Sequence, residues 1–142
     1  MSKFYTVLVV FVVSLFSINN ATAQNLQRKS SVNASLGLSI LFNANLNYEY
    51  NLKNNSNLSL GLGSIAAMGG TITHIDLTHF FLSGKNTNYL EYGYGIMYLK
   101  EGNDSSLIPN FRLGYRSVRS KNYFRLGVSI SEGLYIGKGL YF

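Results

Sequence analysis

Residues 45–52 of the chain read NLNYEYNL, in which leucine and tyrosine alternate with asparagine and glutamate. Successive side chains of a β-strand point to opposite faces, so this period of two predicts a strand with one apolar and one polar face. The alternation recurs at residues 32–40, 58–62, 71–81, 90–98, 110–116, 124–130 and 134–142. Turn-forming residues such as Gly69-Gly70 and Glu132-Gly133 separate most segments. We therefore predict an all-β chain whose eight strands, each of about 9–11 residues, follow one another as a meander.

The polar faces of these segments are rich in glycine and carry charged side chains such as Glu49, Glu91 and Arg112. The interior of an eight-stranded barrel is just wide enough for side chains to fill, and glycines there leave room for large residues. The apolar faces would then meet lipid, because strands of membrane barrels alternate apolar-out and polar-in. The predicted fold is an eight-stranded antiparallel up-and-down transmembrane β-barrel, preceded by a signal peptide.

The first 23 residues differ from the rest of the chain. Lys3 precedes an apolar run from Tyr5 to Phe16, and Ala21-Thr22-Ala23 supplies the small residues of a cleavage site. The run is shorter than the roughly 20 residues that a helix needs to cross a bilayer. We assign residues 1–23 to a cleaved signal peptide and residues 24–142 to one outer-membrane β-barrel domain. The chain has no cysteine, so no disulfide supports the fold.

Seven ionisable residues share the polar faces and are expected inside the barrel: Glu49, Asp76, Glu91, Arg112, Arg116, Arg125 and His74. Buried charges persist only when they are paired and hydrogen-bonded. Three arginines balance three carboxylates in this set. We therefore expect an ion-pair network that plugs the lumen rather than an open pore.

Six tyrosines lie on the apolar faces: Tyr48, Tyr50, Tyr92, Tyr94, Tyr98 and Tyr115. Phenol rings suit the boundary between lipid and water, which predicts that these tyrosines are lipid-interface residues. The alternative is a soluble periplasmic or secreted lipocalin-like barrel, whose apolar faces would point inward around a small apolar ligand. The near absence of lysine from the polar faces disfavours this alternative, because solvated faces usually carry several lysines.

His74 and Asp76 lie two residues apart on one face, and Ser59 or Ser64 could approach from the neighbouring segment. These are the residue types of a hydrolase triad. No motif marks either serine as a nucleophile, so we assign His74 and Asp76 to the interior polar network. The sequence predicts no catalytic residue.

A metal site would require His74, Asp76, Glu49 and Glu91 to converge. The spacing of these residues does not indicate convergence, and the other histidine, His79, has the opposite parity to His74. No glycine loop of the kind that holds a phosphate precedes a helix. We therefore predict no metal and no cofactor.

The last ten residues, GLYIGKGLYF, end on an aromatic residue preceded by hydrophobic residues at alternate positions: Leu134, Ile136, Leu140 and Phe142. The chain resembles the small eight-stranded outer-membrane barrels of Gram-negative bacteria, the OmpA/OmpX-like members of the porin-like superfamily. The resemblance implies that these four residues form the assembly signal, that the barrel-assembly machinery inserts the chain, and that outer-membrane lipids surround it. Lys138 departs from the pattern, since a lysine in the lipid band costs about 2–4 kcal/mol. We expect a bulge to turn Lys138 inward, or a different strand register.

The resemblance also implies external loops after the first, third, fifth and seventh strands. In this chain only Lys100 to Ser106 is longer than a tight turn, which gives little support to a receptor or adhesin role. We expect a monomeric, non-catalytic protein of the outer membrane with a structural or envelope-integrity role. The net charge of +6 does not predict nucleic-acid binding in an exported chain. A lipid-modifying outer-membrane enzyme is a third alternative, which would require His74 to lie beside a serine near one rim.

Overall fold

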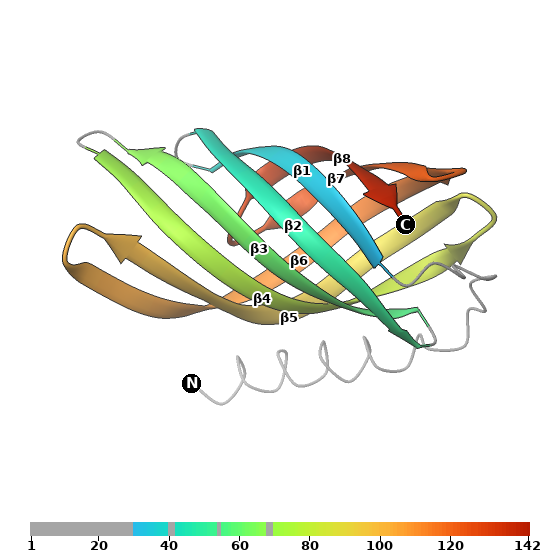
Figure 1. Ribbon diagram of the computed structural model, residues 1–142, viewed down its shortest axis with the longest axis horizontal. Helices are drawn as coiled ribbons and strands as arrows, with labels where there is room; N and C mark the ends of the chain where they lie inside the picture. The colour runs from blue at the N-terminus through green and yellow to red at the C-terminus, as the bar shows by residue number, and fades with distance from the viewer. Residues whose placement is uncertain (1–29, 40–41, 54, 68–69) are drawn as a thin grey trace, which may run out of the picture.

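The computed structural model describes residues 30–39, 42–53, 55–67 and 70–142, which form a closed barrel of eight antiparallel strands (Figure 1). The strands are β1 (Ser30–Leu38), β2 (Phe42–Lys53), β3 (Ser56–Ala67), β4 (Gly70–Lys85), β5 (Asn88–Glu101), β6 (Asp104–Arg119), β7 (Asn122–Ser129) and β8 (Gly133–Tyr141). Each strand pairs with the next, and β1 pairs with β8 to close the barrel. The predicted eight-stranded antiparallel barrel is confirmed. The predicted signal peptide, residues 1–23, lies outside the described residues.

The two ends of the barrel differ in which strand ends they carry, because both described chain ends lie at one of them. Ser30 and Phe142 lie together, because the Phe142 amide donates a 2.9 Å hydrogen bond to the Ser30 carbonyl. The strand ends that precede and follow the β2–β3, β4–β5 and β6–β7 connections also lie at this terminal end, and those of the other four connections lie at the opposite, distal end (Figure 1). None of the described residues forms a helix long and apolar enough to cross a membrane.

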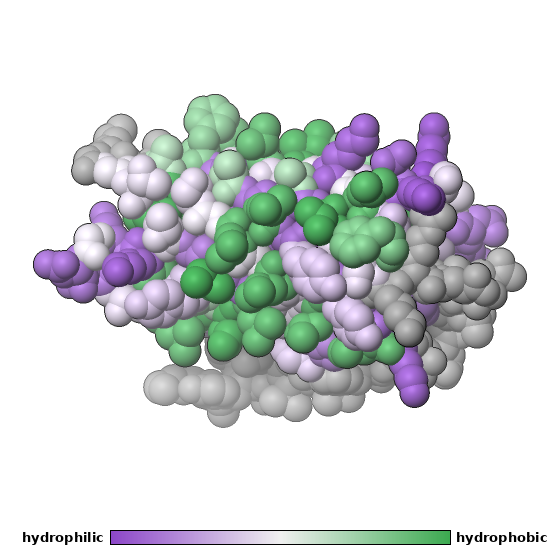
Figure 2. All heavy atoms as spheres, in the orientation of Figure 1, coloured by the Kyte–Doolittle hydropathy of each residue, from purple (hydrophilic) through white to green (hydrophobic). Residues whose placement is uncertain are grey.

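Side chains alternate between the outer surface and the lumen over most of the barrel. Leu36 and Leu62 on the outside are 65% and 54% exposed, whereas Asn33 and Asn47 in the lumen are each 1% exposed. Figure 2 shows hydrophobic residues as a belt across the middle of the visible face, with hydrophilic residues gathered at the two ends. The lipocalin-like alternative required the leucines and tyrosines to point inward, and the structure has the opposite arrangement.

Several strands are longer than predicted, and they shorten the turns. β4 and β6 each have 16 residues, which is longer than predicted, whereas β7 has 8 and is slightly shorter. The expected loop from Lys100 to Ser106 is mostly strand, because β5 continues to Glu101 and β6 starts at Asp104. Only Gly102, with a positive φ of 57°, and Asn103 lie between them. Polar residues at this hairpin suggested a loop, but the backbone ladder continues through them.

Lys138 corrects another expectation. It lies on the exposed outer face of β8, opposite Ala34 of β1 and Phe124 of β7. Both pairings keep one register along β8, so neither the expected bulge nor a shifted register occurs. Lys138 lies toward the terminal end, and a lysine stem can lie along apolar surface while its ammonium reaches the rim.

Gly139 shows why glycines occupy inward positions. A Cβ on Gly139 would lie 2.2 Å from the Cζ atom of Tyr123 and 2.5 Å from its hydroxyl oxygen. Tyr123 is 2% exposed and projects into the lumen from β7. The glycine therefore provides the space that this large ring occupies, as expected for a narrow barrel.

Candidate functional site

Arg116 on β6 lies at the centre of a charge network in the lumen. Its NH1 and NH2 groups donate hydrogen bonds of 2.7 and 2.9 Å to the two carboxylate oxygens of Glu49 on β2. Its Nε and NH2 groups donate bonds of 2.9 and 2.6 Å to Oε2 of Glu91 on β5. All three side chains are buried. One guanidinium thus satisfies two buried carboxylates on different strands, which is what buried charge requires.

Arg125 on β7 and Arg112 on β6 extend the network. NH2 of Arg125 lies 3.2 Å from Oε1 of Glu91 and 3.0 Å from Oε2 of Glu132. Arg112 approaches the same two residues less closely, at 3.4 Å and 3.6 Å. Its guanidinium has no hydrogen-bond partner in the described part of the chain. Arg112 therefore contributes charge rather than hydrogen bonds.

Glu132 is a member of the network that sequence reasoning missed. The alternation assigns it to the turn before β8, but its side chain is 1% exposed in the lumen. The Ser35 hydroxyl donates a hydrogen bond to Glu132, and the Glu132 amide donates a 2.9 Å bond to Ser129 Oγ. Gly133, with a positive φ of 68°, completes the turn. Alternation gives the direction of a side chain only within a strand, so no pattern in the sequence reveals this one.

Asp76 and His74, by contrast, lie in the lumen outside the ion pairs. Asp76 is 1% exposed, and its Oδ1 accepts a 3.1 Å hydrogen bond from the Thr78 hydroxyl. His74 is 2% exposed, and neither ring nitrogen has a hydrogen-bond partner in the residues described. The same residues contain no group of three or more His, Asp or Glu side chains arranged as a metal site.

Apolar and aromatic side chains line the lumen toward the terminal end, which the alternation did not predict. Phe80 and Leu82 of β4 pack with Tyr89 of β5 as a buried cluster. The Cζ atom of Arg116 lies 5.2 Å from the Phe80 ring centroid and 4.3 Å from that of Tyr123. Aromatic faces stabilise a cation at such distances, and these rings shield the network on one side.

The serine–histidine contact of the structure lies elsewhere than the hydrolase hypothesis required. The hydroxyl of Ser56 lies 2.6 Å from Nε2 of His79, and the hydroxyl of Tyr94 lies 3.3 Å from Nδ1. His79 has outward parity on β4. No hydrogen bond joins His74 to Ser59, whose hydroxyl is itself unpartnered in the described residues. None of the described carboxylates contacts the His79 ring. The Ser56–His79 pair therefore lacks the acidic member of a triad in the described residues.

The predicted lipid-interface tyrosines have outward parity. Five of them are 41–46% exposed: Tyr48, Tyr50, Tyr94, Tyr98 and Tyr115. Tyr92 is 7% exposed, and its ring stacks on Phe81 with a centroid distance of 5.6 Å. The set therefore presents phenol rings mainly at the outer surface.

The four residues of the predicted assembly signal point outward from the last strand. Their exposed fractions lie between 48% and 64%: Leu134, Ile136, Leu140 and Phe142. The ring of Phe142 lies 6.5 Å from that of Tyr48, centroid to centroid, at the terminal end. The pattern of alternate outward hydrophobic residues thus continues to the end of the chain.

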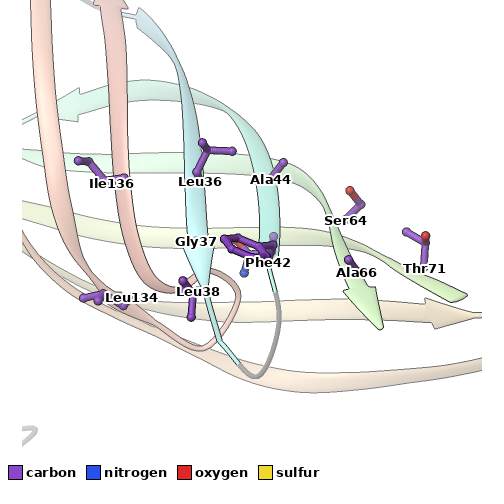
Figure 3. A pocket seen from close by; sticks show the side chains of 11 residues that line it. Leu36, Gly37, Leu38, Phe42, Ala44, Ser64, Ala66, Thr71, Leu134 and Ile136 are labelled. Atoms are coloured by element: carbon purple, nitrogen blue, oxygen red, sulfur yellow. The ribbon is translucent and has the colours of Figure 1, made fainter. Parts of the chain in front are cut away.

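A shallow depression also lies on the outer surface, near the distal end (Figure 3). Leu36 of β1 and Ile136 of β8 border it on one side, and the small Ala44 and Ala66 of β2 and β3 form its opposite side. Most of its lining residues have outward parity, whereas Gly37 and Asn43 have lumen parity. Its lining is mostly apolar, like the belt around it.

No protein-family model matches the sequence, and no curated protein matches it significantly. Solved barrels do match. The N-terminal β-barrel domain of Pseudomonas aeruginosa OprF superposes with a TM-score of 0.67 at 13% identity, over 81% of this chain and 98% of that domain. A de novo designed transmembrane β-barrel gives 0.69 at 11% identity, over 80% and 95% of the two chains. The designed barrel TMB2.3 gives 0.61 at 13% identity, over 81% and 93%. The fold that the resemblance implies is confirmed: the chain folds as a small eight-stranded β-barrel similar to that of the OprF domain.

Proposed function

We propose that the protein is a non-catalytic outer-membrane β-barrel with a structural or envelope-integrity role, exported by its signal peptide. One observation carries this proposal, namely that every strand of the closed barrel exposes apolar side chains on its outer face. Figure 2 shows them on one face of the barrel. Four leucines from four different strands, for example, are between 44% and 54% exposed: Leu46, Leu60, Leu113 and Leu126. Soluble monomers rarely expose contiguous apolar patches beyond a few hundred Å². Lipid is the environment in which this surface is favourable.

The closed hydrogen-bond ladder supports the same location. A hydrocarbon environment requires every backbone polar group to be satisfied within the protein, and a closed barrel leaves no free strand edge. The absence of a free edge also favours a monomer. The likeness to the OprF domain and to designed transmembrane barrels agrees with this proposal.

The lumen of this protein is plugged rather than open in our proposal. Arg116 bridges β2 and β5 from β6, and Arg125 connects Glu91 to Glu132 at the β7–β8 turn. Side chains from several walls therefore cross the interior and bind one another. Moving a solute through the lumen would require breaking buried ion pairs. Removing one partner of such a pair destabilises a protein by about 3–5 kcal/mol.

Two partners follow from the proposed location. Outer-membrane lipids would cover the apolar belt, with the outward tyrosines near the head groups. The barrel-assembly machinery would recognise the outward hydrophobic residues of β8 and its terminal Phe142 during insertion. Truncation of Phe142 should then lower the yield of inserted barrel without altering export.

The location is tested by membrane fractionation of cells that express the chain. The fractions are then compared by gel electrophoresis with and without boiling. We expect an outer-membrane band whose mobility shifts on heating, because a closed barrel resists detergent until it is heated. A soluble periplasmic band without a shift would contradict the proposal. Planar-bilayer recording tests the plug: the wild-type barrel should give no steady conductance, and a stable open channel would contradict a closed lumen.

A further inference from the structure

Two inward glycines of β3 each lie between polar side chains of the neighbouring strands. The register forms two rows across β2, β3 and β4: Asn47–Gly61–Asp76 and Asn45–Gly63–His74. A Cβ on Gly61 would lie 2.1 Å from Asp76 Oδ2 and 2.5 Å from Asn47 Oδ1. These two oxygens therefore both lie close to the space above the glycine, where no side chain separates them. In the second row, the Cβ of Gly63 would lie 1.8 Å from Asn45 Oδ1 and 2.5 Å from His74 Nε2.

The hydrogen-bond network fixes which atom of Asn47 faces Asp76. Asn33 accepts a 2.9 Å bond from Arg125, which can only donate, and donates a 2.8 Å bond to the carboxylate of Glu49, which only accepts. The orientation of the Asn33 amide is thereby set. Asn47 Nδ2 donates a 3.1 Å bond to the same Asn33 oxygen. The Asn47 oxygen must therefore face Asp76. The hydrogen bonds resolve the usual ambiguity between the oxygen and the nitrogen of an amide side chain.

The same reasoning fixes Asn45. Asn43 donates a 3.2 Å hydrogen bond to the backbone carbonyl of Ser131, which only accepts. The Asn43 oxygen is therefore free to accept the 3.1 Å bond from Asn45 Nδ2. The oxygen of Asn45 faces His74 in consequence.

The other carboxylate oxygen of Asp76 is already used. Asn110 donates a 3.1 Å hydrogen bond to Thr78 Oγ1, so the Thr78 proton is directed to Asp76 Oδ1. Asp76 Oδ2 and Asn47 Oδ1 remain, two acceptors facing each other with no donor between them in the described residues. Both residues are 1% exposed. Burying such groups without a partner is costly, so a positively charged or donating species is required there.

The charge of the lumen agrees with this requirement. Among the residues that the structure describes, four carboxylates are buried in the lumen, and three guanidiniums face them: Glu49, Asp76, Glu91 and Glu132 against Arg112, Arg116 and Arg125. The ion pairs of the described residues all involve the three glutamates. Asp76 is thus the carboxylate without an ion-pair partner in the described part of the chain, and one negative charge remains to be neutralised when these seven groups are all ionised.

We propose that the lumen binds one monovalent alkali cation between β2 and β4, above Gly61. Asp76 Oδ2 and Asn47 Oδ1, which both lie close to the space above Gly61, are its protein ligands, because carboxylate and amide oxygens suit hard cations. Asn45 Oδ1 lies in the next row, above Gly63. A single charge neutralises the one negative charge left over, whereas a divalent ion would leave the lumen with a net positive charge. The His74 ring lies beside Asn45 above Gly63 and borders the site. The cation site does not rest on the proposed closure of the lumen, because the same oxygens would bind the ion in a closed or in a conducting barrel.

The test is a comparison of cations at constant ionic strength. The midpoint temperature of the heat-induced gel shift is measured for the refolded, detergent-solubilised barrel in NaCl, in KCl and in N-methyl-D-glucamine chloride. A ligand that binds only the folded state stabilises it by RT ln(1 + [L]/Kd). The midpoint should therefore rise with Na⁺ or K⁺ concentration and stay constant in the large organic cation.

Asp76→Asn separates this site from general salt effects. The new amide keeps an oxygen for the Thr78 proton and can donate to the Asn47 oxygen, so the variant should fold and lose all dependence on Na⁺ and K⁺. The matched control is Asp104→Asn, at an exposed position of the β5–β6 hairpin, which should keep the wild-type dependence. A wild-type midpoint that is equal in all three salts would overturn the proposal, as would an Asp76→Asn barrel that keeps the dependence.

A second measurement needs no variant. The ¹³C chemical shift of the Asp76 carboxyl group is followed by NMR while N-methyl-D-glucamine is replaced by Na⁺. We expect the shift to move with a saturating dependence on Na⁺ concentration. An Asp76 carboxyl signal that stays constant across the titration would show that a proton or a water molecule satisfies the two oxygens, and the cation site would be rejected.

Discussion

Arg116 and Glu49 face each other across the lumen from β6 and β2 and share two hydrogen bonds of 2.7 and 2.9 Å, although 67 positions separate them in the chain. The two strands lie on opposite walls, since three strands separate them on one side of the barrel and three on the other. This pair therefore ties the walls together through the interior. Glu91, between them on β5, shares the same guanidinium.

Replacing Arg116 with leucine should destabilise the barrel more than any other single change in the network. Glu49 and Glu91 would each keep a buried negative charge without its main partner, a loss of about 3–5 kcal/mol. Urea unfolding in detergent micelles, followed by tyrosine fluorescence, measures the free energy. The control is Arg119→Leu, at an exposed position beside the β6–β7 turn. Equal stability of the two variants would contradict the network.

Arg112→Leu should also destabilise the barrel, but less than Arg116→Leu. Arg112 is held at 3.4–4.0 Å from three carboxylates and makes no hydrogen bond to the described residues. Its loss removes charge compensation without breaking a bond. The same unfolding experiment checks the order. Unchanged stability in Arg112→Leu would argue against an interior charge network.

Most of the architecture could be predicted from the sequence, because one property, the period of two, determines strand, parity and face together. Leu60 and Glu49 lie on the predicted sides of the barrel wall for this reason. Strand ends could not be predicted, since polar residues such as those around Gly102 occur both in loops and in exposed hairpins. Only the pairing of β5 with β6 determines where that ladder stops.

The site was less predictable than the fold. Parity identified the buried arginines, but it could not say which carboxylate each one contacts, because that depends on the packing of side chains from several strands. Asp76 therefore entered the predicted network, whereas the structure pairs Glu132 with Arg125 at 3.0 Å. Glu132 lies in a turn, where alternation gives no direction. The buried cluster around Phe80 was missed because its apolar residues occupy positions of polar parity.

Gly139→Ala should destabilise the barrel, whereas Gly70→Ala should have little effect. A Cβ at position 139 would lie 2.2 Å from the Tyr123 ring, which Glu49 and Arg116 hold in place. Overpacking of this kind costs about 1–3 kcal/mol. A Cβ at position 70 meets nothing within 4 Å. Midpoints of heat-induced gel shifts give the comparison, and equal midpoints would show that the lumen can rearrange around the added methyl group.

Lys138→Leu should stabilise the barrel in a lipid bilayer. Lys138 lies outward among apolar neighbours, including Phe124. A lipid-facing lysine costs about 2–4 kcal/mol at the bilayer midplane and about 0–1 kcal/mol near the interface. The expected gain lies between these limits, because the residue lies between the rim and the middle of β8. Unfolding from phosphatidylcholine vesicles measures it, with Lys121→Leu in the exposed β6–β7 turn as the control. A loss of stability in Lys138→Leu alone would place this face outside the lipid.

Lipid contact of the outer belt is the central claim, and fluorescence quenching tests it most directly. The chain has no cysteine, so Leu60→Cys, Leu113→Cys and Asn103→Cys can each carry a single fluorophore. After refolding into vesicles, brominated acyl chains should quench the labels at positions 60 and 113, whereas aqueous iodide should quench the label at the exposed position 103. Labels at positions 60 and 113 that respond to iodide and not to brominated lipid would show that the apolar belt lies outside the membrane.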